Sequence, residues 1–123
     1  MTISLVITGI IFHFLFDWVL QSRDVARRKT EDLDALVYHG MIIYIGTFLF
    51  FVLVAAHVGL IVAIAAFVYS VIHAIQDKYI WTMYKKRYDF YAIDPMQDSI
   101  FFDTMAVDQV LHLILLFVLA SLV

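Results

Sequence analysis

The sequence contains no cysteine, only one proline and four glycines, and only 15% of its 123 residues are charged. Without cysteine the chain can form no disulfide, no thiolate metal site and no thiol nucleophile. The low content of charge, proline and glycine lies far from the balance of a soluble domain, and 64% of the residues are hydrophobic. This composition predicts an integral membrane protein.

Several sequence signatures of enzymes and binding proteins are also missing. The chain has no glycine-rich phosphate loop, no GxSxG elbow and no HExxH motif, which excludes the common soluble nucleotide-binding, serine-hydrolase and metalloprotease classes. No feature predicts nucleic-acid binding. Residues 1–20 lack a basic start and a small-residue cleavage site, so we interpret them as a retained membrane span and not as a signal peptide.

Long apolar segments predict an all-α fold, an antiparallel bundle of four transmembrane helices in a single membrane domain of residues 1–123. A span needs about 20 residues, and four spans with their connections account for nearly the whole chain. We expect the spans at about residues 3–20, 35–55, 59–77 and 103–122. The second and third are separated by so few residues that they predict a tight helical hairpin.

The basic residues indicate how the spans are oriented. All eight lie in the two longer connections, before the second span and before the fourth. Because lysine and arginine near span ends mark the cytoplasmic side, both connections are predicted inside and both termini on the non-cytoplasmic side. Residues 78–102 also interleave aromatic residues with these bases, which predicts a segment that lies in the lipid headgroup region. Asp94 and Pro95 are predicted to break this segment before the fourth span.

Histidine and aspartate occur three times at a spacing of four residues within or at the ends of these apolar segments. The pairs are His13 with Asp17, His73 with Asp77, and Asp108 with His112. This spacing places both side chains of a pair on one face of a helix. Ionisable groups inside a membrane are costly and usually face the interior of a bundle, so the pairs predict a functional site.

The predicted orientation brings the three pairs to one height in the membrane. In every pair the aspartate lies one turn nearer the cytoplasm than the histidine, and His39 of the second span falls at the same level. The charges of each long connection cancel when Asp103, at the start of the fourth span, is counted with the second connection, so the formal net charge of −3 equals Asp17, Asp77 and Asp108. With no lysine or arginine in the spans, these carboxylates must be protonated, paired with imidazolium or matched by a bound cation.

Imidazole and carboxylate groups together suit a divalent metal such as zinc, iron or manganese. The candidate ligands are His13, Asp17, His39, His73, Asp77, Asp108 and His112. Candidate residues that would hold these ligands in place are Gln21, Gln76 and Gln109. Two other interpretations stay open: the same groups could lock the helices together by hydrogen bonds, or they could carry protons or ions.

The leading hypothesis is an intramembrane metal-dependent hydrolase or transferase that acts on a lipid-linked or amphipathic substrate at the cytoplasmic leaflet. The metal would activate water, and one unligated residue among the candidate catalytic aspartates Asp17, Asp77 and Asp108 would act as general base. Basic residues near the span ends could steer an anionic headgroup, or could serve only as topology determinants. They are Arg23, Arg27, Arg28, Lys85, Lys86 and Arg87.

Two alternatives come from other functional classes. The first is a small transporter, channel or pore component that binds an ion or proton in transit through the same polar layer. The second is a non-catalytic membrane partner of a larger complex. Membrane lipid is the expected surrounding in every case, and a homo-oligomer is compatible with each of them.

Four segments resemble a family of small bacterial and phage membrane proteins known only as a domain of unknown function. The segments are HFLFDWVLQ at residues 13–21, YHG at 38–40, HAIQD at 73–77 and DQVLH at 108–112. The resemblance covers most of the chain and implies a protein of the bacterial inner membrane in which this polar set matters, but it implies no activity. In the family pattern a glycine often precedes the first aspartate, whereas Phe16 stands there in this sequence.

Overall fold

The computed structural model describes residues 2–91 and 97–123, and within this range it is helical and contains no strand. The elements are α1 (Ile3–Phe14), the π-helix η1 (Leu15–Val19), α2 (Arg23–Arg28), α3 (Leu33–Ala55), α4 (Leu60–Tyr91) and α5 (Ser99–Ala120). The predicted all-α fold is therefore confirmed. The predicted break at Asp94 and Pro95 lies outside the described residues.

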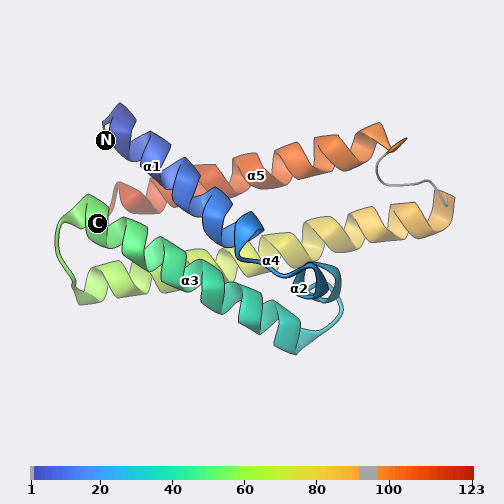
Figure 1. The fold of residues 1–123 in the computed structure, drawn as a ribbon, viewed down its shortest axis with the longest axis horizontal. Coiled ribbons are helices and arrows are strands. Elements are labelled where there is room, and N and C mark those ends of the chain that lie inside the picture. The colour runs from blue at the N-terminus through green and yellow to red at the C-terminus, as the bar shows by residue number, and fades with distance from the viewer. Residues whose placement is uncertain (1, 92–96) are drawn as a thin grey trace.

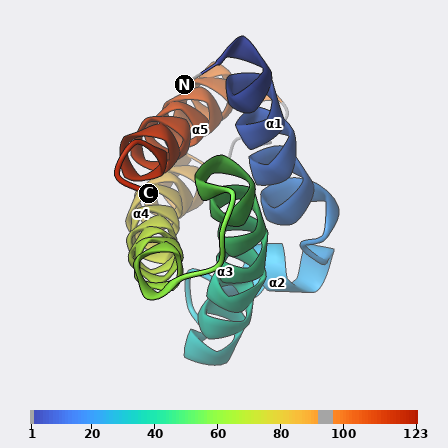
Figure 2. The same ribbon diagram turned by 90° about the vertical axis from the view of Figure 1, so that its left-hand side faces the viewer.

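Three helices, α3, α4 and α5, are long and apolar enough to cross a membrane, and the first apolar helix, Ile3–Val19, is shorter. α3 and α4 form a hairpin, α5 lies beside α4, and α1 packs against α3 and α5 (Figures 1 and 2). Both chain termini lie at the end of the bundle where α3 joins α4, whereas α2 lies away from that end (Figure 1).

The turn between α3 and α4 is as tight as the sequence predicts. α3 ends at Ala56, which has a left-handed backbone conformation with a φ of 56°. The ring Nδ1 of His57 donates to the Ala55 carbonyl (2.8 Å), and the side chain is exposed. The turn therefore uses His57 as a local surface residue, far from the other histidines.

α4 continues well beyond Asp77, where we expected the third span to end. The helix has 32 residues and reaches Tyr91. At 1.5 Å per residue it is about 48 Å long, against about 30 Å for a hydrocarbon core. The described chain contains no proline or glycine between Asp77 and Tyr91 that would end the helix, so the aromatic and basic residues of this stretch extend it.

The core of the bundle is apolar toward the end that holds the termini. Its largest fully buried members are Tyr69, Phe50, Phe51, Ile43 and Leu116. These side chains come from α3, α4 and α5 and separate the polar cluster described below from that end of the bundle. The polar cluster is therefore closed on this side by packed aromatic and aliphatic groups.

Phe16 of η1 packs into the space that Gly46 of α3 leaves open. A Cβ placed on Gly46 would lie 2.3 Å from Cγ of Phe16, which is far inside contact distance. Small residues allow membrane helices to approach closely. The phenylalanine that stands before Asp17 is thus accommodated by a glycine on the facing helix, and this close approach brings Asp17 toward α3.

We expect Gly46→Ala to lower the free energy of unfolding by about 1–3 kcal/mol, because the added methyl group collides with Phe16. Gly40→Ala is the matched control in the same helix, since its Cβ would lie 3.9 Å from the nearest side-chain atom, Cβ of Ala74. That variant should gain up to about 1 kcal/mol from helix propensity. Denaturation in detergent followed by circular dichroism measures both, and equal values would contradict the packing argument.

Candidate metal centre

An irregular turn of the first apolar helix positions Asp17. In η1 the Leu20 amide donates to the Leu15 carbonyl (2.9 Å), five residues earlier. A π-helical turn inserts an extra residue into a helix and recurs at functional sites, where it redirects a side chain. Here it accompanies an Asp17 that is only 3% exposed and faces the bundle interior.

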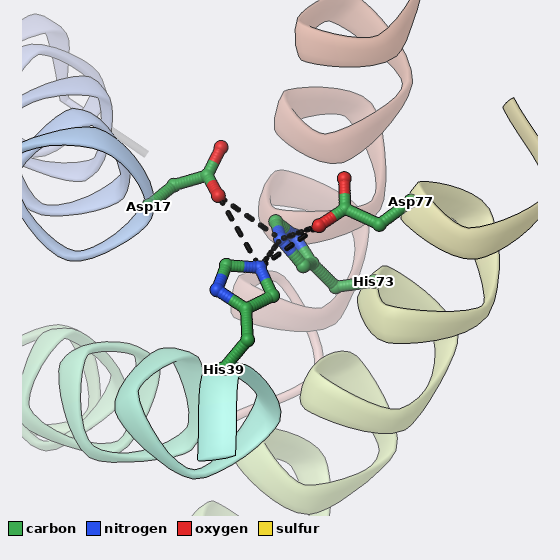
Figure 3. A group of neighbouring side chains, drawn as sticks. All are labelled: Asp17, His39, His73 and Asp77. Carbon is green, nitrogen blue, oxygen red and sulfur yellow. Dashed lines mark hydrogen bonds and ion pairs between the residues drawn. The ribbon is translucent and has the colours of Figure 1, made fainter. Parts of the chain in front are cut away.

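Four buried side chains from three elements point toward a common centre (Figure 3). They are Asp17 of η1, His39 of α3, and His73 and Asp77 of α4. His39 Nε2 lies 2.8 Å from Asp77 Oδ2, 3.2 Å from His73 Nε2 and 3.4 Å from Asp17 Oδ1. His73 Nε2 lies 3.4 Å from Asp17 Oδ1 and 3.6 Å from Asp77 Oδ2. We call these residues the four-donor set.

Gln21 orients the His39 ring within this set. With the Gln21 amide turned to suit its neighbours, its carbonyl oxygen accepts from His39 Nδ1 (3.0 Å) and its nitrogen donates to the Asp17 carbonyl (3.1 Å). His39 then carries its proton on Nδ1, so the lone pair of Nε2 faces the centre. The structure thus places Gln21 beside a candidate ligand, as the sequence predicts.

His13 lies next to the centre but contacts other groups. Its Nε2 is 3.0 Å from Gln109 Oε1, and its Nδ1 is 3.2 Å from the Tyr69 hydroxyl. The Gln109 amide nitrogen in turn donates to Asp17 Oδ2 (3.1 Å). This hydrogen-bond chain orients the Asp17 carboxylate. Residues that surround metal ligands commonly have this role. His13 itself lies 3.7 Å from Asp17 Oδ2.

A second group of candidate ligands adjoins the four-donor set. His112 Nε2 of α5 lies 3.5 Å from Asp108 Oδ1 and 3.9 Å from Asp77 Oδ1. The Trp81 indole donates to Asp108 Oδ2 (3.1 Å), so the extended part of α4 contributes to this group. The His112 ring stacks on His73 with centroids 3.7 Å apart. All seven predicted ligands therefore lie in one buried cluster.

Lys29 is the buried cation that sequence reasoning missed. It follows α2 in the first long connection, yet it is only 7% exposed, and its Nζ lies 2.5 Å from Asp77 Oδ2. The expectation that no lysine or arginine balances the buried aspartates is therefore wrong. The connection folds back so that α2 packs against α3, and a long lysine stem can then reach into the bundle. No sequence signal separates Lys29 from the other seven basic residues.

A cavity of about 380 Å³ opens beside the cluster. Asp17, Asp108 and Gln109 line it on the side of the candidate ligands. Its apolar lining residues are Trp18, Trp81, Phe101 and Met105. The cavity thus combines a wide apolar surface with two of the candidate catalytic aspartates, which is the composition of a site for an amphipathic molecule.

Only two of the six predicted steering residues, Arg23 and Lys85, line this cavity. Lys85 Nζ also donates to the Arg27 carbonyl (2.8 Å), which ties α4 to the end of α2. Arg28 pairs with Asp32, and this guanidinium holds the pKa of the half-buried Asp32 carboxyl below its usual range. The predicted steering residues that do not line the cavity are Arg27, Arg28, Lys86 and Arg87.

Gln76, the third predicted partner residue, has a different environment from Gln21 and Gln109. Its carbonyl oxygen is buried and has no hydrogen-bond partner among the described residues. Gln76 precedes Asp77 in the sequence. Because successive residues of a helix do not share a face, Gln76 does not lie on the face that carries His73 and Asp77. Its side chain does not contact a candidate ligand through any hydrogen bond in the described part of the chain.

Membrane-length helices around a buried His/Asp cluster define an all-α membrane-type bundle with a candidate metal centre. Residues 5–123 match the family described as "Protein of unknown function (DUF3307)", and the chain belongs to this family. The match spans nearly the whole chain and confirms the family resemblance seen in the sequence. No match was found among curated proteins or among solved structures.

Proposed function

We propose that this protein is an intramembrane metal-binding enzyme, a hydrolase or transferase that acts on a lipid-linked or amphipathic substrate. The observation that carries the proposal is the spacing of the four-donor set. Tetrahedral zinc with bonds near 2.1 Å requires ligand atoms about 3.4 Å apart. Five of the six distances among the four donor atoms range from 2.8 to 3.6 Å, and all four atoms lie within 4.8 Å of one another.

Charge balance supports one divalent cation at this position. The two carboxylates of the set carry two negative charges and neutral imidazoles carry none, so a divalent ion neutralises the set. The positive charge of Lys29, which pairs with Asp77, then balances the third buried carboxylate, Asp108, in the net charge of the cluster. Zinc, iron and manganese all accept this mixture of nitrogen and oxygen donors.

The cavity supports a reaction at the edge of the centre. A divalent metal lowers the pKa of a water molecule that it binds, which supplies a nucleophile at neutral pH. In hydrolysis the water oxygen bonds to the electrophilic atom of the substrate, the bond to the leaving group breaks, and the leaving group takes up a proton. Asp108 lies outside the four-donor set and lines the cavity, where a substrate would meet it.

We further propose that the chain crosses a bacterial inner membrane four times with both termini outside. The apolar helix Ile3–Val19 provides the first crossing, since its length of 17 residues reaches the lower limit for a span. All lysines and arginines lie either between η1 and α3 or in the second half of α4, which supports this orientation. The centre would then face the cytoplasmic leaflet, next to the headgroups.

Metal analysis of the protein purified in mild detergent tests the proposal. We expect about one tightly bound zinc, iron or manganese per chain by mass spectrometry of the element content. The double variant His39→Ala/His73→Ala should lose it, because half of the four donors are removed. His57→Ala is the matched control, since His57 is exposed in the α3–α4 turn. A metal-free wild-type protein after extraction without chelators would contradict the proposal.

Enzymatic activity is tested separately on vesicles made from a bacterial lipid extract. We expect the metal-loaded protein to convert a component of the extract, detected by mass spectrometry, and the chelator-treated protein to convert none. Asp108→Asn should reduce the conversion at least tenfold while the metal in the four-donor set stays bound, because this carboxylate lies outside that set. Equal conversion by both forms would show that the metal does not serve catalysis.

A further inference from the structure

We infer that a second divalent cation binds between Asp77, Asp108 and His112, so that Asp77 bridges two metal ions, and that this pair of ions binds a phosphate ester. The inference rests on the proposed function, because Asp77 also belongs to the four-donor set.

Three buried ligand atoms without partners mark the second site. Asp77 Oδ1, Asp108 Oδ1 and His112 Nε2 accept or donate no hydrogen bond within residues 2–91 and 97–123. Their residues are at most 1% exposed, so all three atoms are buried. An unpaired buried acceptor is costly, and three of them close together are rare in a folded protein. A cation among them would satisfy all three.

The distances fit a shared coordination site. The three residues offer ligand atoms that lie within 4.8 Å of one another, and His112 Nε2 is 3.5 Å from the Asp108 oxygen. Two carboxylates and one imidazole leave coordination positions open, as catalytic metal sites do. Asp108 lines the cavity, so the open positions of this site face the space where a substrate can lie.

Asp77 presents its two oxygens to different groups. Oδ2 lies 2.8 Å from His39 Nε2 in the four-donor set, whereas Oδ1 lies 3.9 Å from His112 Nε2. A carboxylate that uses one oxygen for each of two ions keeps them close, and catalytic pairs are about 3.5–4 Å apart. The stacked rings of His73 and His112 bring the two ligand sets side by side.

The charge of the loaded cluster indicates a phosphate ester. Three aspartates carry three negative charges and Lys29 carries one positive charge, so two divalent ions leave the cluster with two positive charges. A phosphate monoester dianion neutralises this excess, and paired metal ions are a common device for phosphoryl chemistry. Arg23 lines the same cavity and adds a further positive charge.

The reaction on such a substrate balances without another reactant. The oxygen of a water molecule bonds to phosphorus, the phosphorus–oxygen ester bond breaks, and the leaving alcohol oxygen takes up a water proton. Two cations lower the pKa of this water, so no side-chain base is required and Asp108 serves as a ligand. The apolar cavity lining formed by Trp18, Phe101 and Met105 fits the alkyl part of an amphipathic ester.

Manganese binding to the detergent-purified protein tests this inference. We expect two Mn²⁺ per chain by equilibrium dialysis, and an electron paramagnetic resonance signal of two coupled ions. His112→Ala and the isosteric Asp108→Asn should each reduce the number to one, whereas His57→Ala should leave two. One Mn²⁺ in the wild type overturns the second site and keeps the proposed function. No Mn²⁺, with no zinc or iron bound either, overturns both.

Anions test the substrate class in the same measurement. Inorganic phosphate should tighten the weaker Mn²⁺ site at least tenfold, within the 5–150-fold range usual for coupling between ligands, and chloride at equal ionic strength should not. Nanodiscs with and without phosphatidic acid separate a lipid headgroup from free phosphate as the source. A stronger effect of phosphatidic acid supports an amphipathic ester, and no effect of either anion overturns the phosphate assignment.

Discussion

Asp77→Asn is expected to abolish metal binding, with affinity at least 1,000-fold weaker than that of the wild type. The Asp77 carboxylate belongs to the four-donor set, faces His112 with its other oxygen and pairs with Lys29. An amide supplies no negative charge to a cation, and loss of even an outer partner of a metal ligand typically costs 10–100-fold. Isothermal titration of the detergent-purified apoprotein with zinc measures the effect.

Two further variants show whether the loss is specific. Asp77→Asn also leaves the Lys29 ammonium buried without its partner, and breaking a buried pair costs about 3–5 kcal/mol of stability. The double variant Asp77→Asn/Lys29→Met removes both charges and should recover most of the stability without recovering the metal. Asp103→Asn changes an exposed aspartate of α5 and should bind zinc as the wild type does. Zinc binding by the double variant at wild-type affinity would contradict the role of Asp77 as a ligand.

Lys29→Met is expected to lower the stability of the apoprotein but to raise the affinity of the protein for zinc. In the apoprotein the variant leaves the buried carboxylates with less compensating charge, and breaking the Lys29–Asp77 pair should cost about 3–5 kcal/mol of stability. If zinc occupies the four-donor set as proposed, the ammonium and the metal would both approach Asp77 Oδ2 and would repel each other. Removal of Lys29 should therefore tighten zinc binding about tenfold or more, since like charges at close range and low dielectric repel strongly.

Thermal unfolding in detergent measures how Lys29→Met changes the melting temperature without and with zinc. With excess chelator the melting temperature of Lys29→Met should lie below that of the wild type, and with saturating zinc the difference should shrink or reverse, because a tighter ligand stabilises the folded state more. Lys86→Met, at an exposed position of α4, should change neither value. A Lys29→Met protein that is less stable by the same amount in both conditions would show that Lys29 has only a structural role.

The burial of the polar residues of the apolar segments could be predicted from the sequence because their neighbours are apolar. The spacing of four residues and the apolar surroundings of His13, Asp17, His73, Asp77 and the pair on α5 leave few places for such groups except the bundle interior. The structure gathers all of them, with His39, in one buried cluster. The hairpin of α3 and α4 and the exposure of His57 follow from the short connection between apolar segments.

Other features depend on contacts between distant segments. The π-helical turn at Asp17 and the fit of Phe16 against Gly46 come from packing, which no local propensity reports. The continuation of α4 to Tyr91 lets Trp81 reach Asp108. Sequence reasoning treated residues 78–102 as a separate headgroup segment, since basic and aromatic residues are typical of that region in membrane proteins.

The sequence by itself determined the all-α membrane-type fold. It also determined that the histidines and aspartates of the apolar segments lie together, because an unpaired charge in apolar surroundings is too costly. Only the tertiary structure decided which partner each group has. Asp17, His39, His73 and Asp77 form the four-donor set, His13 pairs with Gln109, and Lys29 folds in from a connection. These choices depend on packing between elements that are far apart in the sequence.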